Sequence, residues 1–255
     1  MNILLSGNKG FIGTEIWKWL EESQYPHRGF DEHEKIPDGK FDLILHFGAR
    51  TLIRKSKELP YQYFLDNSDL TMRILEKARK DDSIVVFPTS GSVLEATNPY
   101  SLSKRHGEEW VKLYGQIYGV KHYILKLYNI YGETSRKGAV YLFSKAALNH
   151  ETAIVYGDGT HKRDYVHVSD LVRVISSIVS EKIPPGQYEV GTGIGTSVLD
   201  LISMVEKETG TKINIEKKEF VVPEAESLFA KTPIIPDMIS IKEGVRRVIQ
   251  SLKFQ

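Results

Sequence analysis

The chain has 255 residues, of which 41% are hydrophobic and 26% are charged, the balance of an ordinary globular protein. Its 34 basic and 33 acidic residues leave a net charge of +1, which excludes a field that attracts nucleic acid nonspecifically. The absence of cysteine excludes disulfides, thiolate metal sites and cysteine nucleophiles. We find neither an N-terminal signal pattern nor an apolar run of the roughly 20 residues that a membrane helix needs, and expect a cytoplasmic protein without membrane or nucleic-acid partners.

Apolar segments alternate with helical segments through the first half of the chain. Apolar runs predict strands at residues 2–6, 42–47, 84–87 and 122–129, with a weaker candidate at residues 27–31. Helical patterns run from the first glycine-rich turn to Leu20 and over residues 61–80, 100–118, 200–209 and 241–252, whereas residues 221–236 look irregular. This alternation predicts an α/β fold, a doubly wound parallel sheet with helices on both faces.

A glycine-rich turn joins the first predicted strand to the first helix. Its sequence is Gly7-Asn8-Lys9-Gly10-Phe11-Ile12-Gly13. Glycines let backbone N–H groups approach a pyrophosphate, and the N-terminus of the helix stabilises its negative charge. Asp31 follows Gly13 by 18 residues, close to the spacing of an acid that binds the adenosine ribose hydroxyls. A turn without a ligand, and a solvated acidic loop around Asp31, are the alternatives.

Tyr100 and Lys104 are four residues apart in a predicted helix, so both side chains lie on one face. An ammonium near a phenol favours the phenolate, which predicts a Tyr100 pKa below the usual value of about 10. Such a pair can transfer a proton near neutral pH, although most tyrosines at this spacing merely cover a helix. Ser90 follows an apolar strand, where its hydroxyl can reach a substrate oxygen or the Tyr100 phenol, or else cap its own turn.

The eight histidines show no metal-ligand spacing, so no metal site is expected. His46 ends a buried strand and is interpreted as a core histidine with satisfied hydrogen bonds. Taken alone, Arg163-Asp164-Tyr165 is interpreted as a structural pair.

Taken together and in order, these segments resemble the extended short-chain dehydrogenase/reductase family, which includes nucleotide-sugar epimerases, dehydratases and 4-keto reductases. The resemblance covers nearly the whole chain. Besides the glycine turn and the Tyr100–Lys104 pair, it includes His46-Phe47-Gly48-Ala49, Asp66-Asn67, Thr89-Ser90-Gly91-Ser92-Val93, Leu125-Lys126-Leu127-Tyr128-Asn129-Ile130-Tyr131-Gly132, Gly157-Asp158-Gly159-Thr160-His161-Lys162-Arg163-Asp164-Tyr165-Val166-His167-Val168, and Tyr188-Glu189-Val190-Gly191-Thr192-Gly193 followed by Ser197. The segment that contains Arg163 is the most specific match.

The resemblance implies a domain organisation and a set of site residues. Residues 1–132 plus about 164–192 would form an NAD-binding Rossmann domain, and about 133–163 plus 193–255 a small substrate-binding lobe. The implied catalytic residues are Ser90, Tyr100 and Lys104. The implied cofactor-binding residues are Gly7, Gly10, Phe11, Ile12, Gly13, Asp31, Phe47, Gly48, Ala49, Asn67, Tyr100, Lys104 and Tyr128, and the substrate-binding residues are Ser92, Asn129 and Arg163, the last on the diphosphate.

The implied reaction is NAD-dependent epimerisation at C4 of a nucleoside-diphosphate sugar through a transient 4-keto intermediate, as in UDP-glucose 4-epimerases. An NAD(P)H-dependent 4-keto reductase is the alternative, and a nonenzymatic cofactor-sensing protein is a third reading. Dehydratases of the family carry Asp-Glu after the active-site hydroxyl residue, and Gly91 and Ser92 stand in those places. Asp31 favours NAD because a carboxylate repels a 2′-phosphate, whereas the nearby Arg28 and Lys35 could reverse that preference.

The family also implies a homodimer, in which the helices at residues 61–80 and 100–118 pair with those of a second copy. Ile74, Leu75, Trp110, Leu113 and Ile117 supply apolar positions on these helices, either for the partner or for the protein's own core.

The chain departs from the family in three places. The short stretch between Asp31 and Asp42 omits a strand whose acid usually contacts the adenine. Lys126 stands where arginine is frequent. Pro223-Glu224-Ala225-Glu226 falls where a second diphosphate-binding arginine is often found, a role that Arg246 or Arg247 could fill unless their helix points them at solvent.

Overall fold

The computed structural model describes residues 1–31, 33–91, 97–220 and 225–254, which form two compact units. Unit 1 consists of Met1–Leu127 and Ile175–Tyr188, and unit 2 of Tyr128–Val174 and Glu189–Gln255. The expected NAD-binding domain also included residues 128–132, 164–174 and 189–192, which here belong to unit 2.

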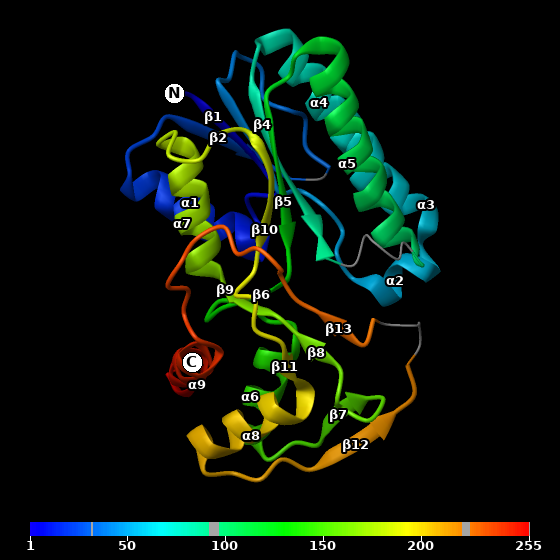
Figure 1. Ribbon diagram of the computed structural model, residues 1–255, viewed down its shortest axis with the longest axis vertical. Helices are drawn as coiled ribbons and strands as arrows, with labels where there is room; N and C mark the ends of the chain where they lie inside the picture. The colour runs from blue at the N-terminus through cyan, green and yellow to red at the C-terminus, as the bar shows by residue number, and fades with distance from the viewer. Residues whose placement is uncertain (32, 92–96, 221–224, 255) are drawn as a thin grey trace. The chain divides into compact units, whose positions relative to one another are not determined.

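Unit 1 is built on a six-stranded sheet in the order β10-β5-β4-β3-β1-β2. The strands are β1 (Ile3–Ser6), β2 (His27–Phe30), β3 (Leu43–His46), β4 (Ile84–Ser90), β5 (His122–Leu127) and β10 (Gly186–Val190). The pairings of β1 with β2 and β3, of β3 with β4 and of β4 with β5 are parallel. The helices are α1 (Phe11–Glu22), α2 (Ile53–Glu58), α3 (Pro60–Tyr63), η1 (Phe64–Asp69), α4 (Leu70–Asp81) and α5 (Pro99–Tyr118). Helix α7 (Val168–Val179) belongs to unit 1 only from Ile175 onward. Figure 1 shows α1 on one face of the sheet and α4 and α5 on the other, which confirms the doubly wound arrangement.

The central strands are mainly apolar because helices cover both of their faces. All four residues of β1 and all four of β3 are buried. Leu4, Ile44 and Val85, from three neighbouring strands, join Ile74 and Leu75 of α4 in one core. Ile74 and Leu75 are therefore core residues and do not face a partner.

A π-helical turn interrupts the single helix predicted at residues 61–80. The structure has α3, then η1, then α4, so the helical ladder is offset within Phe64–Asp69. Asp66 and Asn67 of η1 are buried, and both contact Arg50: Asp66 pairs with its guanidinium, and Asn67 Oδ1 accepts from its backbone N–H at 2.8 Å. Such turns are rare and occur frequently at functional sites.

The sheet ends at β2, because no described residue between β2 and β3 forms a strand. The common doubly wound order 3-2-1-4-5-6 has one more strand on that side. The predicted omission of this strand is confirmed.

Among its described residues, unit 2 contains short strands and helices with a core of their own. Its strands are β6 (Asn129–Tyr131), β7 (Ala153–Tyr156), β8 (Lys162–Arg163), β9 (Tyr165–His167), β11 (Thr196–Ser197), β12 (Ile215–Lys218) and β13 (Ser227–Leu228), and its helices are α6 (Ala139–Asn149), α8 (Val198–Thr209) and α9 (Ile241–Lys253). Phe143 of α6, Leu201 of α8 and Val248 of α9 lie in the same core. Ser197 and Asp200 form a reciprocal capping box that fixes the start of α8.

Within the described residues, none of the helices combines the length and the apolar character that crossing a bilayer requires. The same residues contain no group of three or more histidine, aspartate or glutamate side chains placed to hold a metal ion.

Asp164 is the central polar contact of unit 2. Its fully buried carboxylate accepts hydrogen bonds from Thr192 N (3.0 Å), Thr192 Oγ1 (2.6 Å), Gly193 N (2.9 Å) and Ala230 N (3.1 Å). It therefore joins three segments that are far apart in the sequence.

We expect Asp164→Asn to lower the free energy of unfolding by about 2–4 kcal/mol, because an amide offers one acceptor and turns an NH₂ group toward N–H donors. Urea denaturation followed by circular dichroism measures this change. Asp158→Asn is the matched control, since Asp158 accepts two bonds from Thr160 in an exposed turn. Equal losses in the two variants would contradict the account.

Candidate active site

The glycine turn brings the start of α1 and the end of β3 into close backbone contact. A Cβ on Gly7, whose φ is +76°, would lie 2.6 Å from the Gly48 nitrogen, and a Cβ on Gly13 would lie 1.9 Å from the Gly7 carbonyl oxygen. Helix α1 begins at Phe11, directly after Gly10. This cradle fits a dinucleotide diphosphate, which needs close backbone approach and a helix N-terminus.

Asn8, which the sequence analysis does not single out, adds a polar group to the turn. Its Oδ1 atom is buried and has no hydrogen-bond partner in the described structure. Its carboxamide lies over the backbone of Gly29, where a Cβ would come within 2.7 Å of it. Sequence spacing could not have identified Asn8, because what marks it is a buried oxygen without a hydrogen-bond partner, which only the structure shows.

Asp31 directly follows β2, at the carboxyl edge of the sheet where the ribose acid is predicted. Its backbone N–H donates to Glu34 Oε2 at 2.8 Å, and Glu34 pairs with Lys9 of the glycine turn. The two cations that could attract a 2′-phosphate are engaged elsewhere: Arg28 donates to the Asp38 carbonyl at 3.1 Å, and Lys35 pairs with the Asp38 carboxylate at 2.8 Å.

Phe47, Gly48 and Ala49 follow β3 along the same edge. Phe47 N donates to the Ser6 carbonyl at 3.2 Å, and Gly48 N donates to Ser6 Oγ at 3.1 Å. Asn67 also donates from Nδ2 to the Arg50 carbonyl at 3.1 Å. Its carboxamide therefore clamps the backbone directly after Ala49.

Ser90 and Tyr100 come together in unit 1. Ser90 is the last residue of β4 and Tyr100 the second residue of α5, and the Ser90 hydroxyl is hydrogen-bonded to the Tyr100 phenol. Asn98 caps α5 by accepting from Ser101 N, which fixes where the helix begins. Lys104 lies one turn further and is 6% exposed, with Nζ 4.3 Å from the centroid of the Phe87 ring.

Burial moves the pKa values of both groups toward their neutral forms. It raises the pKa of Tyr100 above 10, an effect that the hydrogen bond from Ser90 opposes, and it lowers the pKa of Lys104 to about 7. The prediction that Tyr100 has a lowered pKa is thus wrong for the protein alone, because lost hydration of the phenolate dominates. The phenol needs further positive charge beside it to act as a base near neutral pH.

The predicted residues Tyr128, Asn129 and Arg163 lie in unit 2. Tyr128 donates its hydroxyl to Glu189 at 2.9 Å, and burial raises its pKa. Asn129 Nδ2 is buried without a hydrogen-bond partner among the described residues. Arg163 donates from Nη1 to the carbonyls of Lys162 and Ala225, each at 2.9 Å.

Two further predictions concern the diphosphate and the sugar. Arg246 and Arg247 both pair with Glu243 on their own helix α9, so the two guanidinium groups share one carboxylate. Ser92, Pro223 and Glu224 lie outside the described residues.

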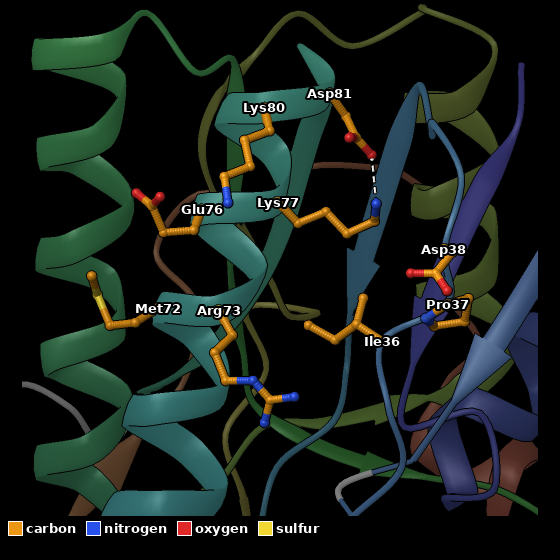
Figure 2. Close-up of a pocket in the computed structure, with 9 residues that line it drawn as sticks. All are labelled: Ile36, Pro37, Asp38, Met72, Arg73, Glu76, Lys77, Lys80 and Asp81. Carbon is orange, nitrogen blue, oxygen red and sulfur yellow. Dashed lines mark ion pairs between the residues drawn. The ribbon is translucent and has the colours of Figure 1, made fainter.

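Two cavities open beside the segment that replaces the omitted strand. One, of about 450 Å³, is shown in Figure 2, where Ile36 and Pro37 face side chains of α4; its lining is Ile36, Pro37, Asp38, Met72, Arg73, Glu76, Lys77, Lys80 and Asp81. The other, of about 500 Å³, is lined by His33, Glu34, Lys35, Gln62, Leu65, Asp66, Asp69, Leu70 and Arg73. Neither lining contains a predicted catalytic, cofactor-binding or substrate-binding residue.

Comparison with known families identifies the class of protein. The model of the NAD dependent epimerase/dehydratase family matches residues 31–191, which is more than half of the chain, and the chain belongs to this family.

Individual relatives are similar over most of their length. A putative UDP-glucose 4-epimerase of Methanocaldococcus jannaschii is 29% identical, with 98% of each chain covered. A bifunctional UDP-glucose 4-epimerase and UDP-xylose 4-epimerase of Arabidopsis thaliana is 28% identical, over 87% of this chain and 74% of that one. The first alignment extends over 306 residues against the 255 of this chain, so part of that relative has no counterpart.

Solved structures share the fold. The UDP-glucuronic acid 4-epimerase of Bacillus cereus, in complex with UDP-glucuronic acid and NAD, has a TM-score of 0.89 at 22% identity, with 100% of this chain and 99% of that chain covered. A dTDP-glucose 4,6-dehydratase from Streptomyces venezuelae has a TM-score of 0.88 at 19% identity, with coverage of 100% and 97%. The fold alone therefore does not separate epimerase from dehydratase.

The lowered pKa of Lys104 predicts a pH dependence of stability in the cofactor-free protein. Its folded pKa of about 7 lies below the ordinary value of 10.5, so between these values the unfolded chain binds more protons and stability rises with pH. We expect the stability advantage of Lys104→Met over the wild type to shrink by about 2–3 kcal/mol between pH 7 and pH 9. Urea denaturation at both pH values measures it, and an unchanged difference would contradict a buried, proton-releasing lysine.

Proposed function

We propose that the protein is an NAD-dependent epimerase that inverts C4 of a UDP-sugar through a transient 4-keto sugar. The observation that carries the proposal is the hydrogen bond between Ser90 and Tyr100, with Lys104 one helical turn away. Membership of the NAD dependent family and the UDP-glucose 4-epimerases among its relatives support this reaction.

The cofactor would bind along the carboxyl edge of unit 1. In the proposal, the backbone of Gly7, Gly10, Phe11, Ile12 and Gly13 holds the diphosphate, and Asp31 the adenosine ribose. Phe47, Gly48 and Ala49 support the cofactor, and Asn67 fixes that segment. Tyr128 is assigned to the cofactor on the family resemblance alone. When bound there, NAD would supply the hydride chemistry at C4 of the sugar.

Tyr100 would move the proton that accompanies the hydride. Its phenol takes the proton of the C4 hydroxyl and later gives it back, while Ser90 donates a hydrogen bond to the developing carbonyl oxygen. Lys104 in its protonated form would lower the pKa of the phenol during the reaction, as would the positive charge of an oxidised nicotinamide. Inversion requires the 4-keto sugar to present its other face before the hydride returns.

Substrate binding is assigned to unit 2 and to the loop after β4. The unpartnered Nδ2 of Asn129 is a free donor that suits a sugar or phosphate oxygen. Arg163 would bind the diphosphate and Ser92 the sugar, as the family resemblance implies.

The 4-keto reductase is the second candidate, and cofactor choice separates the two. Asp31 directly follows β2, and Arg28 and Lys35 both contact Asp38, which supports NAD over NADP. Dehydration is not proposed, since Gly91 offers no acid or base at the position of the dehydratase aspartate.

A cytoplasmic homodimer completes the proposal; the absence of cysteine suits the reducing cytoplasm. Trp110, Leu113 and Ile117 form an exposed apolar stripe on α5, 37–59% exposed, and Leu102 extends it. Tyr61 and Phe64, on the adjacent helical segments, are 72% and 53% exposed. Apolar surface of this extent on neighbouring helices favours pairing with a second copy.

We expect the protein to interconvert a UDP-sugar and its C4 epimer without added cofactor. Incubation with UDP-glucose, UDP-glucuronic acid or UDP-N-acetylglucosamine, followed by chromatography, tests this. Tyr100→Phe should lower turnover by about 10²–10⁴ while the fold persists, whereas Tyr118→Phe on the exposed face of α5 should leave it unchanged. Stoichiometric NADPH consumption with a 4-keto sugar, and no epimer, would favour the reductase.

The dimer is tested by light scattering at micromolar concentration. We expect a dimeric mass for the wild type and a monomeric mass for Trp110→Glu/Ile117→Glu, because charge on the apolar stripe prevents its burial. Leu142→Glu, on the exposed face of α6, is the control and should remain dimeric. A monomeric wild type would refute the dimer.

A further inference from the structure

A directed chain of hydrogen bonds crosses the core of unit 1. The Gly48 N–H donates to Ser6 Oγ at 3.1 Å, and Ser6 Oγ lies 2.7 Å from His46 Nδ1. His46 Nε2 lies 2.9 Å from Thr71 Oγ1, whose hydroxyl donates to the Asn67 carbonyl at 2.6 Å. Ser6, His46 and Thr71 are all at most 3% exposed.

The donor and acceptor roles along this series of hydrogen bonds fix the tautomer of His46. The single hydroxyl proton of Thr71 is used on the Asn67 carbonyl, so toward His46 the Thr71 oxygen accepts. We therefore assign the proton to Nε2, and Nδ1 accepts from the Ser6 hydroxyl. Burial, reinforced by the charge of Lys104, lowers the pKa of His46 to about 3, so the imidazole stays neutral and keeps this one arrangement.

Both ends of this series of hydrogen bonds reach segments of the candidate active site. A Cβ on Gly7 of the glycine turn would lie only 2.6 Å from the Gly48 nitrogen, so Gly48 packs against that turn. At the other end, Asn67 Nδ2 donates to Ser103 Oγ at 2.8 Å, and Ser103 donates in turn to the Tyr100 carbonyl at 2.8 Å. The chain thus connects the cofactor turn with the first turn of the helix that carries Tyr100.

Core packing alone does not explain this arrangement. Apolar side chains of similar volume would fill the same space without the cost of desolvating three polar groups. We propose that His46 is a positioning residue, which through Ser6 fixes the Gly48–Ala49 cofactor segment and through Thr71 fixes Asn67 and the helix of Tyr100. This inference rests on the proposed function, since it assigns those segments to cofactor and catalysis.

Two amide substitutions separate the two ends of the chain. In His46→Asn, the introduced carboxamide places its oxygen near the position of the imidazole Nδ1 and keeps the bond from Ser6. In His46→Gln, the longer side chain places its amide nitrogen near the position of Nε2 and keeps the bond to Thr71. We expect His46→Gln to raise the Kd for NAD about tenfold with kcat at saturating NAD little changed. We expect His46→Asn to lower kcat about tenfold and to raise the Kd for NAD much less than His46→Gln does, because Asn67 also holds the backbone after Ala49.

Variants of Ser6 and Thr71 test the same two hydrogen bonds in case the His46 variants do not fold. Ser6→Ala should behave as His46→Gln does, and Thr71→Val as His46→Asn does. Ser83→Ala is the control, because Ser83 is an equally buried hydroxyl that donates to the Phe41 carbonyl at the amino end of the sheet; it should lower the melting temperature alone.

NAD binding is measured by calorimetry, separately from turnover. If the wild type binds no NAD, the proposed function fails. If it binds NAD, the comparison of Kd values decides the inference even without turnover. If His46→Gln and His46→Asn change the Kd for NAD and kcat to the same extent, His46 has no positioning role. A change in melting temperature alone would also overturn that role.

Discussion

The contact between the glycine turn and the end of β3 is the constraint on which the rest of unit 1 depends. Gly7, Gly13 and Gly48 approach so closely that a Cβ on Gly13 would lie 1.9 Å from a backbone oxygen. This approach sets α1 directly on the sheet, and it places the N-terminus of α1 at the edge where a cofactor diphosphate is proposed to bind. The hydrogen bond from Gly48 to Ser6 holds the same contact from the side of the core.

The shortened connection between β2 and β3 is the main departure from the common form of this fold. Without the outer strand, β2 becomes the edge of the sheet, and residues 33–38 border two cavities beside α4 and η1. Glu34 and Lys9 join that segment to the glycine turn, and Asp38 binds both Arg28 and Lys35. The cations near Asp31 therefore all contact groups of residues 33–38, which is consistent with the proposed preference for NAD.

Local patterns predicted the elements whose signals are local. Apolar runs identified the central strands, and the Asn98 cap and Gly119 delimit a helix that was predicted within one residue. The π-helical turn was missed because Phe64–Asp69 has an ordinary helical sequence, and its geometry depends on buried contacts of Asp66 and Asn67 with Arg50. A sequence also does not show which distant residues form hydrogen bonds with each other. His46 was correctly interpreted as a core residue with satisfied hydrogen bonds, but its bonds to Ser6 and Thr71 were not predictable. The direction of the Tyr100 pKa was wrong because spacing shows Lys104 but not the burial of the phenol.

The central claim is that one hydride leaves C4 of the sugar and returns to the same carbon on the opposite face. A UDP-sugar deuterated at C4, incubated with the protein in ordinary water and analysed by mass spectrometry and NMR, tests it most directly. The account predicts a C4 epimer that retains the deuterium at C4, with no net change in cofactor absorbance. An epimer that carries solvent hydrogen at C4, or the absence of any epimer from a protein with bound NAD, would contradict it.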